Sequence, residues 1–176
     1  DLIIPLNEFQ EELKGTVVLL GVPQDEGVRR NGGRVGAAKA PDSIRTAFYK
    51  LTSFLYADAK LSSIENIRII DAGNIRIEGL ELEEIHKNQR EVVGQLLSLG
   101  ALPIILGGGH DIAYPDGAAL GDCGEPFGVL NFDAHTDVRP LIDGKNAHSG
   151  SGFREILEDD SLNLHRFCEF GIQSFA

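Results

Sequence analysis

The feature that most constrains the fold is a regular alternation of short apolar runs with longer segments of helical periodicity. The apolar runs, each of strand length, are residues 16–22, 67–71, 101–106, 127–133 and 166–173. Helices are expected over residues 41–54 with Pro41 in the first turn, from Leu82 to a stop at Gly100, and over residues 112–120 and 152–158. Such alternation predicts a three-layer α/β/α domain built on a mostly parallel sheet.

One predicted strand ends in residues that can bind a metal ion. Residues 127–132 are followed at once by Asp133-Ala134-His135-Thr136-Asp137. Alternate residues of an extended segment project from one face, so the three polar side chains can share a cavity. A strict strand would hold the two Asp residues about 13 Å apart, so sharing an ion requires the chain to curl after Asp133. Carboxylates with one imidazole favour Mn, with Mg, Zn and Fe as alternatives, whereas a solvated turn would carry these groups only by chance.

A second predicted strand ends in a histidine. The apolar run of residues 102–106 leads into Gly107-Gly108-Gly109-His110-Asp111. Glycines let the backbone turn sharply and approach a ligand closely. A lone histidine at such a place is more often a turn residue, but open α/β sheets bind ligands beyond the carboxyl ends of their strands. We therefore expect His110, Asp133, His135 and Asp137 to meet in one pocket at that edge of the sheet.

Composition excludes several classes of partner. The 176 residues are about one domain and enough to bury a core. A net charge of −11 argues against nucleic acid or an anionic membrane as a partner. No apolar run approaches the roughly 18 residues of a membrane span, and no leader peptide is expected. The cytoplasm is therefore the expected location. Cys123 and Cys168 are expected to be buried reduced thiols, and His86 and His165 to be surface residues.

Taken together, the motifs resemble the ureohydrolase family of dimanganese amidine hydrolases, which includes arginase, agmatinase and formimidoylglutamase. The resemblance covers most of the chain and implies an arginase-like fold. The motif at residues 132–137 is highly specific, whereas the first strand and the loop after it would be weak alone. The segments that carry the resemblance are Val17-Val18-Leu19-Leu20-Gly21-Val22-Pro23, Asn31-Gly32-Gly33-Arg34-Val35-Gly36-Ala37, Pro41-Asp42-Ser43-Ile44-Arg45, Gly107-Gly108-Gly109-His110-Asp111 and Phe132-Asp133-Ala134-His135-Thr136-Asp137.

The resemblance implies a centre with two Mn²⁺ ions and a set of ligands for it. Asp133 should bridge both ions, His110 and Asp137 should complete one, and His135 should belong to the other. Two ions about 3.5–4 Å apart lower the pKa of a bridging water, so that hydroxide can attack an amidine carbon near neutral pH. His148 is the nearest candidate to protonate the leaving nitrogen.

Within the family, the chain looks most like formimidoylglutamase, which cleaves N-formimino-L-glutamate to L-glutamate and formamide in histidine degradation. Arg139 stands where arginase has a substrate-contacting Asn, and Ser149 stands at the position of the arginase proton-shuttle His. With Arg154, these residues are predicted to bind the substrate, because a guanidinium recognises a carboxylate in a bidentate manner. An ordinary surface or loop ion pair is the alternative for each arginine.

One family motif, Ser-x-Asp-x-Asp-x-x-Asp-Pro, has no counterpart in the sequence. The adjacent pair Asp159-Asp160 cannot replace it, because neighbouring residues of a helix face different directions. We therefore expect residues 1–176 to be the N-terminal part of a single arginase-like domain that by itself binds Mn weakly and hydrolyses nothing at a useful rate.

Several alternatives stay open. Agmatinase, guanidinobutyrase and arginase are alternative activities within the family. Two further alternatives are a deacetylase of the related fold, which uses a single zinc, and a catalytically inactive fragment. The resemblance also implies a small-molecule substrate and a homo-oligomer.

Overall fold

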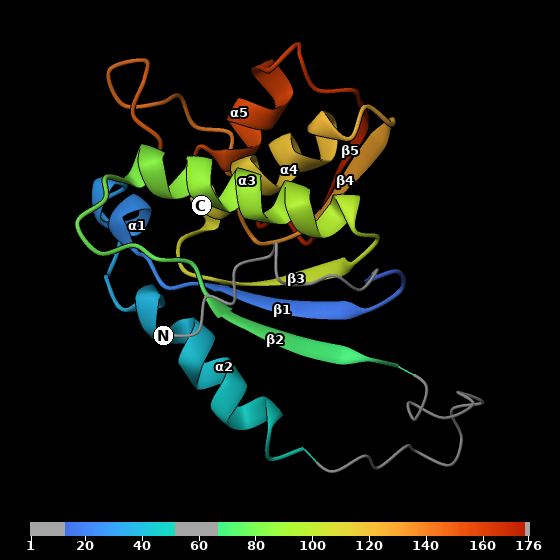
Figure 1. Cartoon of the computed structure of the whole chain (residues 1–176). Helices are drawn as coiled ribbons and strands as arrows, with labels where there is room; N and C mark the ends of the chain where they lie inside the picture. The colour runs from blue at the N-terminus through green and yellow to red at the C-terminus, as the bar shows by residue number, and fades with distance from the viewer. Residues whose placement is uncertain (1–12, 52–66, 175–176) are drawn as a thin grey trace.

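The computed structural model describes residues 13–51 and 67–174, and its strands form two parallel groups (Figure 1). The first group has the order β2-β1-β3, and the second is the pair β4-β5. All pairings in both groups are parallel, as the alternation of strands and helices predicted. The strands are β1 (Val17–Val22), β2 (Ile69–Asn74), β3 (Leu102–Gly107), β4 (Phe127–Phe132) and β5 (Leu164–Phe170).

Helices connect the strands and lie on both faces of the first sheet. In Figure 1, α3 lies on one side of the strands β1 to β3, and α2 lies on the other. This arrangement confirms the predicted α/β class with a parallel sheet between helical layers. The helices are α1 (Glu26–Arg30), α2 (Ala40–Phe48), α3 (Leu82–Ser98), α4 (Ala113–Asp122) and α5 (Gly152–Glu158), with short 3-10 turns η2 (Ala37–Lys39) and η4 (His110–Ile112).

The main core lies between β1 and α3. Val18, Leu20 and Val22 alternate along β1 and are buried in the same cluster as Ile85 and Leu96 of α3. Fully burying one such side chain stabilises the fold by about 1.5–3 kcal/mol. A capping box between Glu81 and Glu84 fixes where α3 begins. The sheet and this helix therefore form a rigid base for the loops that follow the strands.

A second, smaller core packs α4 and α5 against β4 and β5. Its buried centre includes Ala118, Phe153 and Ile156, and Phe167 of β5 packs against it. Because side chains alternate along a strand, the next residue, Cys168, points to the opposite face and is exposed. Cys123, at the end of α4, is also exposed. The expectation of buried thiols was therefore wrong for both cysteines.

The predicted element boundaries shift by a few residues. Helix α2 ends at Phe48, although a helix to residue 54 was expected. Tyr49 follows the helix, and its hydroxyl donates to Asp71 within β2, which fixes the end of α2 against that strand. Residues 52–66, which include the rest of that prediction, lie outside the described residues. Strand β5 ends at Phe170 rather than at residue 173, because Gly171 turns the chain with a φ of 94°.

Among the helices of residues 13–51 and 67–174, none combines the length and apolar character needed to span a bilayer.

The packing of α3 against α4 buries one carboxyl group. Gln89 donates from Nε2 to the Asp116 carboxylate at 2.7 Å and to the carbonyl oxygen of Ile112 at 3.0 Å. Burial raises the pKa of Asp116 from its ordinary value of 3.8 to about 7, and the hydrogen bond from Gln89 offsets this only partly. Near neutral pH, this carboxyl therefore holds a proton more often in the folded than in the unfolded protein.

Asp116→Asn should change how stability depends on pH. Because the folded Asp116 has the raised pKa, the folded wild-type protein binds more protons between about pH 4 and pH 7 and loses stability as pH rises. Asn keeps the oxygen that accepts from Gln89 and cannot ionise. Urea denaturation measures the free energy of unfolding of the variant and of wild type at pH 5 and pH 8. The value for the variant minus the value for wild type should be higher at pH 8 than at pH 5, by at least about 1 kcal/mol.

The matched control is Asp122→Asn at the exposed end of the same helix. The hydrogen bond from Arg90 lowers the pKa of Asp122, so this carboxyl is ionised at both pH values. The difference in free energy of unfolding between Asp122→Asn and wild type should therefore be the same at pH 5 and pH 8. If the difference between Asp116→Asn and wild type were also the same at pH 5 and pH 8, burial would not raise the pKa of Asp116.

Candidate metal centre

Glycines after β3 place His110 at the strand end. A Cβ on Gly108 would lie 2.1 Å from the carbonyl oxygen of Gln24, and one on Gly109 would lie 2.3 Å from the Asp111 carboxylate. No side chain fits at either position, so the sequence needs glycine there. The chain then makes the single 3-10 turn η4, whose first residue is His110. Asp133 follows β4 directly, so both residues lie at carboxyl ends of strands.

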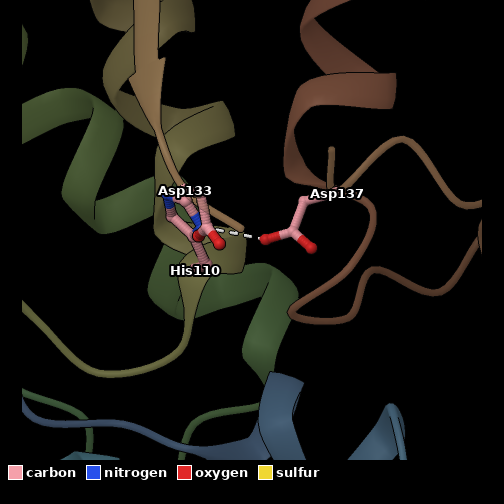
Figure 2. Close-up of side chains that lie close together, drawn as sticks. All are labelled: His110, Asp133 and Asp137. Atoms are coloured by element: carbon pink, nitrogen blue, oxygen red, sulfur yellow. Dashed lines mark hydrogen bonds and ion pairs between the residues drawn. The ribbon is translucent and has the colours of Figure 1, made fainter. Parts of the chain in front are cut away.

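Three side chains converge on one point. His110 Nδ1 lies 2.8 Å from Asp137 Oδ2 and 3.1 Å from Asp133 Oδ2 (Figure 2). One ligand atom from each of the three residues lies within 4.8 Å of the other two. The chain bends at residues 133–135, which is the curl that the sequence required, and Asp137 itself adopts a left-handed conformation with a φ of 46°. The predicted convergence of these side chains is therefore present in the structure.

His135 lies on the other side of Asp133. Its Nδ1 is 3.3 Å from Asp133 Oδ1, and its backbone N–H donates to the same oxygen at 2.9 Å. The two oxygens of Asp133 thus face different histidines. All four predicted ligands line one cavity of about 590 Å³. Their role as metal ligands remains a prediction.

Electrostatics in the cluster favours a bound cation. The hydrogen bond with Asp137 raises the pKa of His110, and the charge of Asp133 adds to this effect, although burial opposes it. Partial burial acts to raise the pKa of Asp133, but the hydrogen bond from the His135 backbone and the charge of His110 outweigh it, so the pKa is lowered. Ionised carboxylate oxygens and an imidazole nitrogen at this spacing fit a divalent ion such as Mn²⁺.

A buried network behind the cluster was missed at the level of sequence. Asp111 is fully buried, and its Oδ2 contacts His86 Nε2 at 2.7 Å and accepts from Gln24 Nε2 at 2.8 Å. A Cβ on Gly27 of α1 would lie 2.0 Å from Asp111 Oδ1. Asp111 therefore anchors the η4 turn between α1 and α3.

The expectation that His86 is a surface residue was wrong, because its ring is buried against Asp111. The charged residues around it in the sequence suggested a solvated helix face. The available signal was Asp111 itself, since a carboxylate that directly follows a candidate ligand in a glycine-rich turn needs a partner. His165, by contrast, is exposed as expected.

His148 is placed where it cannot easily exchange a proton with a substrate. It is buried and does not line the cavity. The Gly150 N–H donates to its Nδ1 at 3.1 Å, which leaves the ring proton on Nε2, 3.0 Å from the carbonyl oxygen of Pro140. Both ring nitrogens therefore hold the backbone of the loop, and this placement argues against the predicted proton transfer.

Of the three residues predicted to bind substrate, two line the cavity. Arg139 and Ser149 lie in its wall together with Asn31, which was not among the predicted substrate-binding residues. Arg154 does not line it: its guanidinium forms an ion pair with Glu158, one turn further along α5, at 2.5 Å. For Arg154, the structure thus favours the alternative of an ordinary surface ion pair.

This parallel α/β domain carries its candidate metal-binding cluster on the loops that follow its strands. The chain belongs to the arginase family, whose family model matches residues 15–176. The predicted resemblance to the family of arginase, agmatinase and formimidoylglutamase is thereby confirmed.

Curated relatives carry the name formimidoylglutamase. The Clostridium tetani protein is 35% identical over 190 residues, which cover 99% of this chain and 53% of the relative. The Klebsiella pneumoniae protein is 39% identical over 163 residues, which cover 90% of this chain and 48% of the relative. The chain therefore spans about half the length of the curated relatives that it matches.

Solved structures agree with this family assignment. Trypanosoma cruzi formiminoglutamase with Mn²⁺ superimposes with a TM-score of 0.85 at 36% identity, over 99% of this chain and 58% of that one. Proclavaminate amidino hydrolase from Streptomyces clavuligerus, at 23% identity and a TM-score of 0.79, shares the fold. The predicted arginase-like fold is confirmed by these comparisons.

His86→Ala should lower the free energy of unfolding by about 1–3 kcal/mol, because it leaves the buried Asp111 carboxylate short of a partner. Lys87→Ala, at the next and exposed position of the same helix, should change it by no more than about 0.5 kcal/mol. Urea denaturation of the two variants beside wild type measures both values. Equal effects would show that the contact between His86 and Asp111 does not stabilise the fold.

Proposed function

We propose that the protein is a Mn-dependent hydrolase that cleaves N-formimino-L-glutamate to L-glutamate and formamide. One observation carries the proposal. A single cavity holds a carboxylate–imidazole cluster, made by His110, Asp133 and Asp137, together with a cationic group, Arg139. The cluster suits a hydrolytic metal centre, and the arginine suits a substrate that carries carboxylates. The names of the relatives support the same activity.

The geometry of Asp133 supports its proposed role as the bridging ligand. Its Oδ2 faces His110 and its Oδ1 faces His135. One carboxylate can thus serve two metal positions, with Asp137 beside His110 on the first and His135 on the second. When bound, two Mn²⁺ ions would lower the pKa of a water so that hydroxide is available near neutral pH.

The wall of the cavity supports a substrate with negative charge. A guanidinium binds a carboxylate with two parallel, charge-assisted hydrogen bonds, and Arg139 presents such a group to the cavity. The same group repels the cationic guanidinium of arginine or agmatine. We propose that Arg139 and Ser149 hold a substrate carboxylate while the amidine carbon faces the metal cluster.

The alternative of a single-zinc deacetylase receives less support. Asp137 contacts His110 at 2.8 Å and belongs to the cluster, and a single-zinc site would have no use for Asp137 as a ligand of a second metal. Agmatinase, guanidinobutyrase and arginase remain alternative activities. The cytoplasmic location and the homo-oligomeric state stay predictions.

A comparison of substrates tests the proposal. The natural-length protein, loaded with Mn²⁺, should release formamide from N-formimino-L-glutamate faster than it cleaves agmatine or arginine. Removal of the metal by a chelator should abolish turnover, and added Mn²⁺ should restore it, because the hydroxide depends on the metal. Faster cleavage of agmatine or arginine would contradict the proposed substrate and leave the metal-dependent chemistry in place.

Arg139→Ala should lower kcat/KM for N-formimino-L-glutamate about ten- to a hundredfold, because a charged hydrogen bond is lost. Mn content should not change. Arg154→Ala is the matched control, since Arg154 pairs with Glu158 outside the cavity, and its kcat/KM should stay near that of wild type. Equal losses in both variants would argue against carboxylate binding by Arg139.

A further inference from the structure

We infer that Asn31 is a positioning residue that sets substrate specificity by orienting Arg139 and Ser149 toward a substrate carboxylate. The inference rests on the proposed function, which it deepens. Asn31 follows directly after α1, and the loop between β4 and α5 carries the other two residues. All three line the cavity that contains the carboxylate–imidazole cluster.

The side-chain amide of Asn31 contacts both partners at once. Its Oδ1 accepts a hydrogen bond from Arg139 Nη1 at 3.2 Å, and its Nδ2 donates to Ser149 Oγ at 3.1 Å. An amide is suited to this place because it offers an acceptor to the cation and a donor to the hydroxyl. Aspartate could accept from Arg139 but could not donate to Ser149.

The hydrogen-bond donors of Ser149 and Arg139 that are not used within the protein favour an anionic ligand. Because Ser149 Oγ accepts from Asn31, its hydroxyl hydrogen stays available, and within residues 13–51 and 67–174 that hydroxyl donates to no group. Arg139 has five N–H donors, and in the same part of the chain its side chain uses one, toward Asn31. Two carboxylate oxygens can accept from the remaining donors of both residues.

The backbone holds this arrangement in place. The Ser149 N–H donates to the Gly27 carbonyl of α1 at 3.0 Å, and the Arg139 N–H donates to the Gly150 carbonyl at 2.8 Å. A Cβ on Gly150 would lie 3.1 Å from Asn31 Nδ2 and 3.3 Å from Arg139 Cδ, so the glycine lets the two side chains approach the loop. The loop itself is therefore fixed without Asn31, and the role of the Asn31 side chain is to orient the two polar groups.

Steady-state kinetics of Asn31→Asp and Asn31→Ala in the natural-length, Mn-loaded protein test the inference. Asn31→Asp should raise KM for N-formimino-L-glutamate at least tenfold, because it brings a negative charge beside the proposed carboxylate site. Asn31→Ala should raise KM about three- to tenfold. In both variants kcat should change less than threefold, and Mn content and thermal midpoint should match wild type. If Asn31→Asp does not fold, Asn31→Ala carries the test.

Two controls separate positioning from a structural role. Asn163→Asp makes the same substitution outside the cavity, where Asn163 Nδ2 donates to the Gly124 carbonyl, and should leave KM unchanged. Formimino derivatives of glycine and of 4-aminobutyrate each lack one of the two substrate carboxylates. For the derivative that lacks the carboxylate held by Arg139 and Ser149, KM should be the same in wild type and in Asn31→Ala.

Other results would overturn the inference. An unchanged KM in both Asn31 variants, with an active wild type, removes the role of Asn31 and leaves the proposed function standing. Loss of Mn or a lowered thermal midpoint together with lower kcat would assign Asn31 a structural role instead. A wild-type protein that does not cleave N-formimino-L-glutamate removes the proposed function and, with it, this inference.

Discussion

The structure of the site depends on the approach of two carboxylates to one imidazole nitrogen. Asp133 and Asp137 both lie within 3.1 Å of His110 Nδ1, in a partly buried cavity. Two carboxylates so close together repel each other unless a cation lies between them. The raised pKa of His110 expresses the same attraction for positive charge. A ligand that binds the folded state and not the unfolded chain stabilises it, so a divalent ion at this position should couple metal binding to folding.

Backbone constraints bring these groups together. Gly108 and Gly109 allow the chain to pass Gln24 and Asp111, where any side chain would collide. The chain bends at residues 133–135, and Asp137 adopts a left-handed conformation that costs energy for a non-glycine residue; its carboxylate lies 2.8 Å from His110 Nδ1. Asp111 fixes the η4 turn from behind through His86 and Gln24. The cluster is thus held by the fold itself and not by its own hydrogen bonds alone.

Much of the fold and of the metal cluster could be predicted from the sequence, because strand-end motifs combine a periodic apolar run with adjacent ligands. The contacts that single histidines make could not be predicted from the sequence. His86 stands among charged neighbours, and only the three-dimensional packing reveals the buried Asp111 beside it. His148 looked available for proton transfer, but both its ring nitrogens bind backbone groups of its own loop. Arg154 and Glu158 are one turn apart on α5, and Arg154 pairs with Glu158 and does not line the cavity.

We propose that His110, Asp133 and Asp137 hold one Mn²⁺ ion and that His135 belongs to a second metal position on the other side of Asp133. Anomalous diffraction at the manganese absorption edge, from crystals of the natural-length protein grown with Mn²⁺, tests this directly. We predict one anomalous peak among His110 Nδ1 and the carboxylates of Asp133 and Asp137, and a second peak on the His135 side of Asp133, about 3.5–4 Å away. Manganese bound elsewhere, with no peak beside His110, would contradict the account.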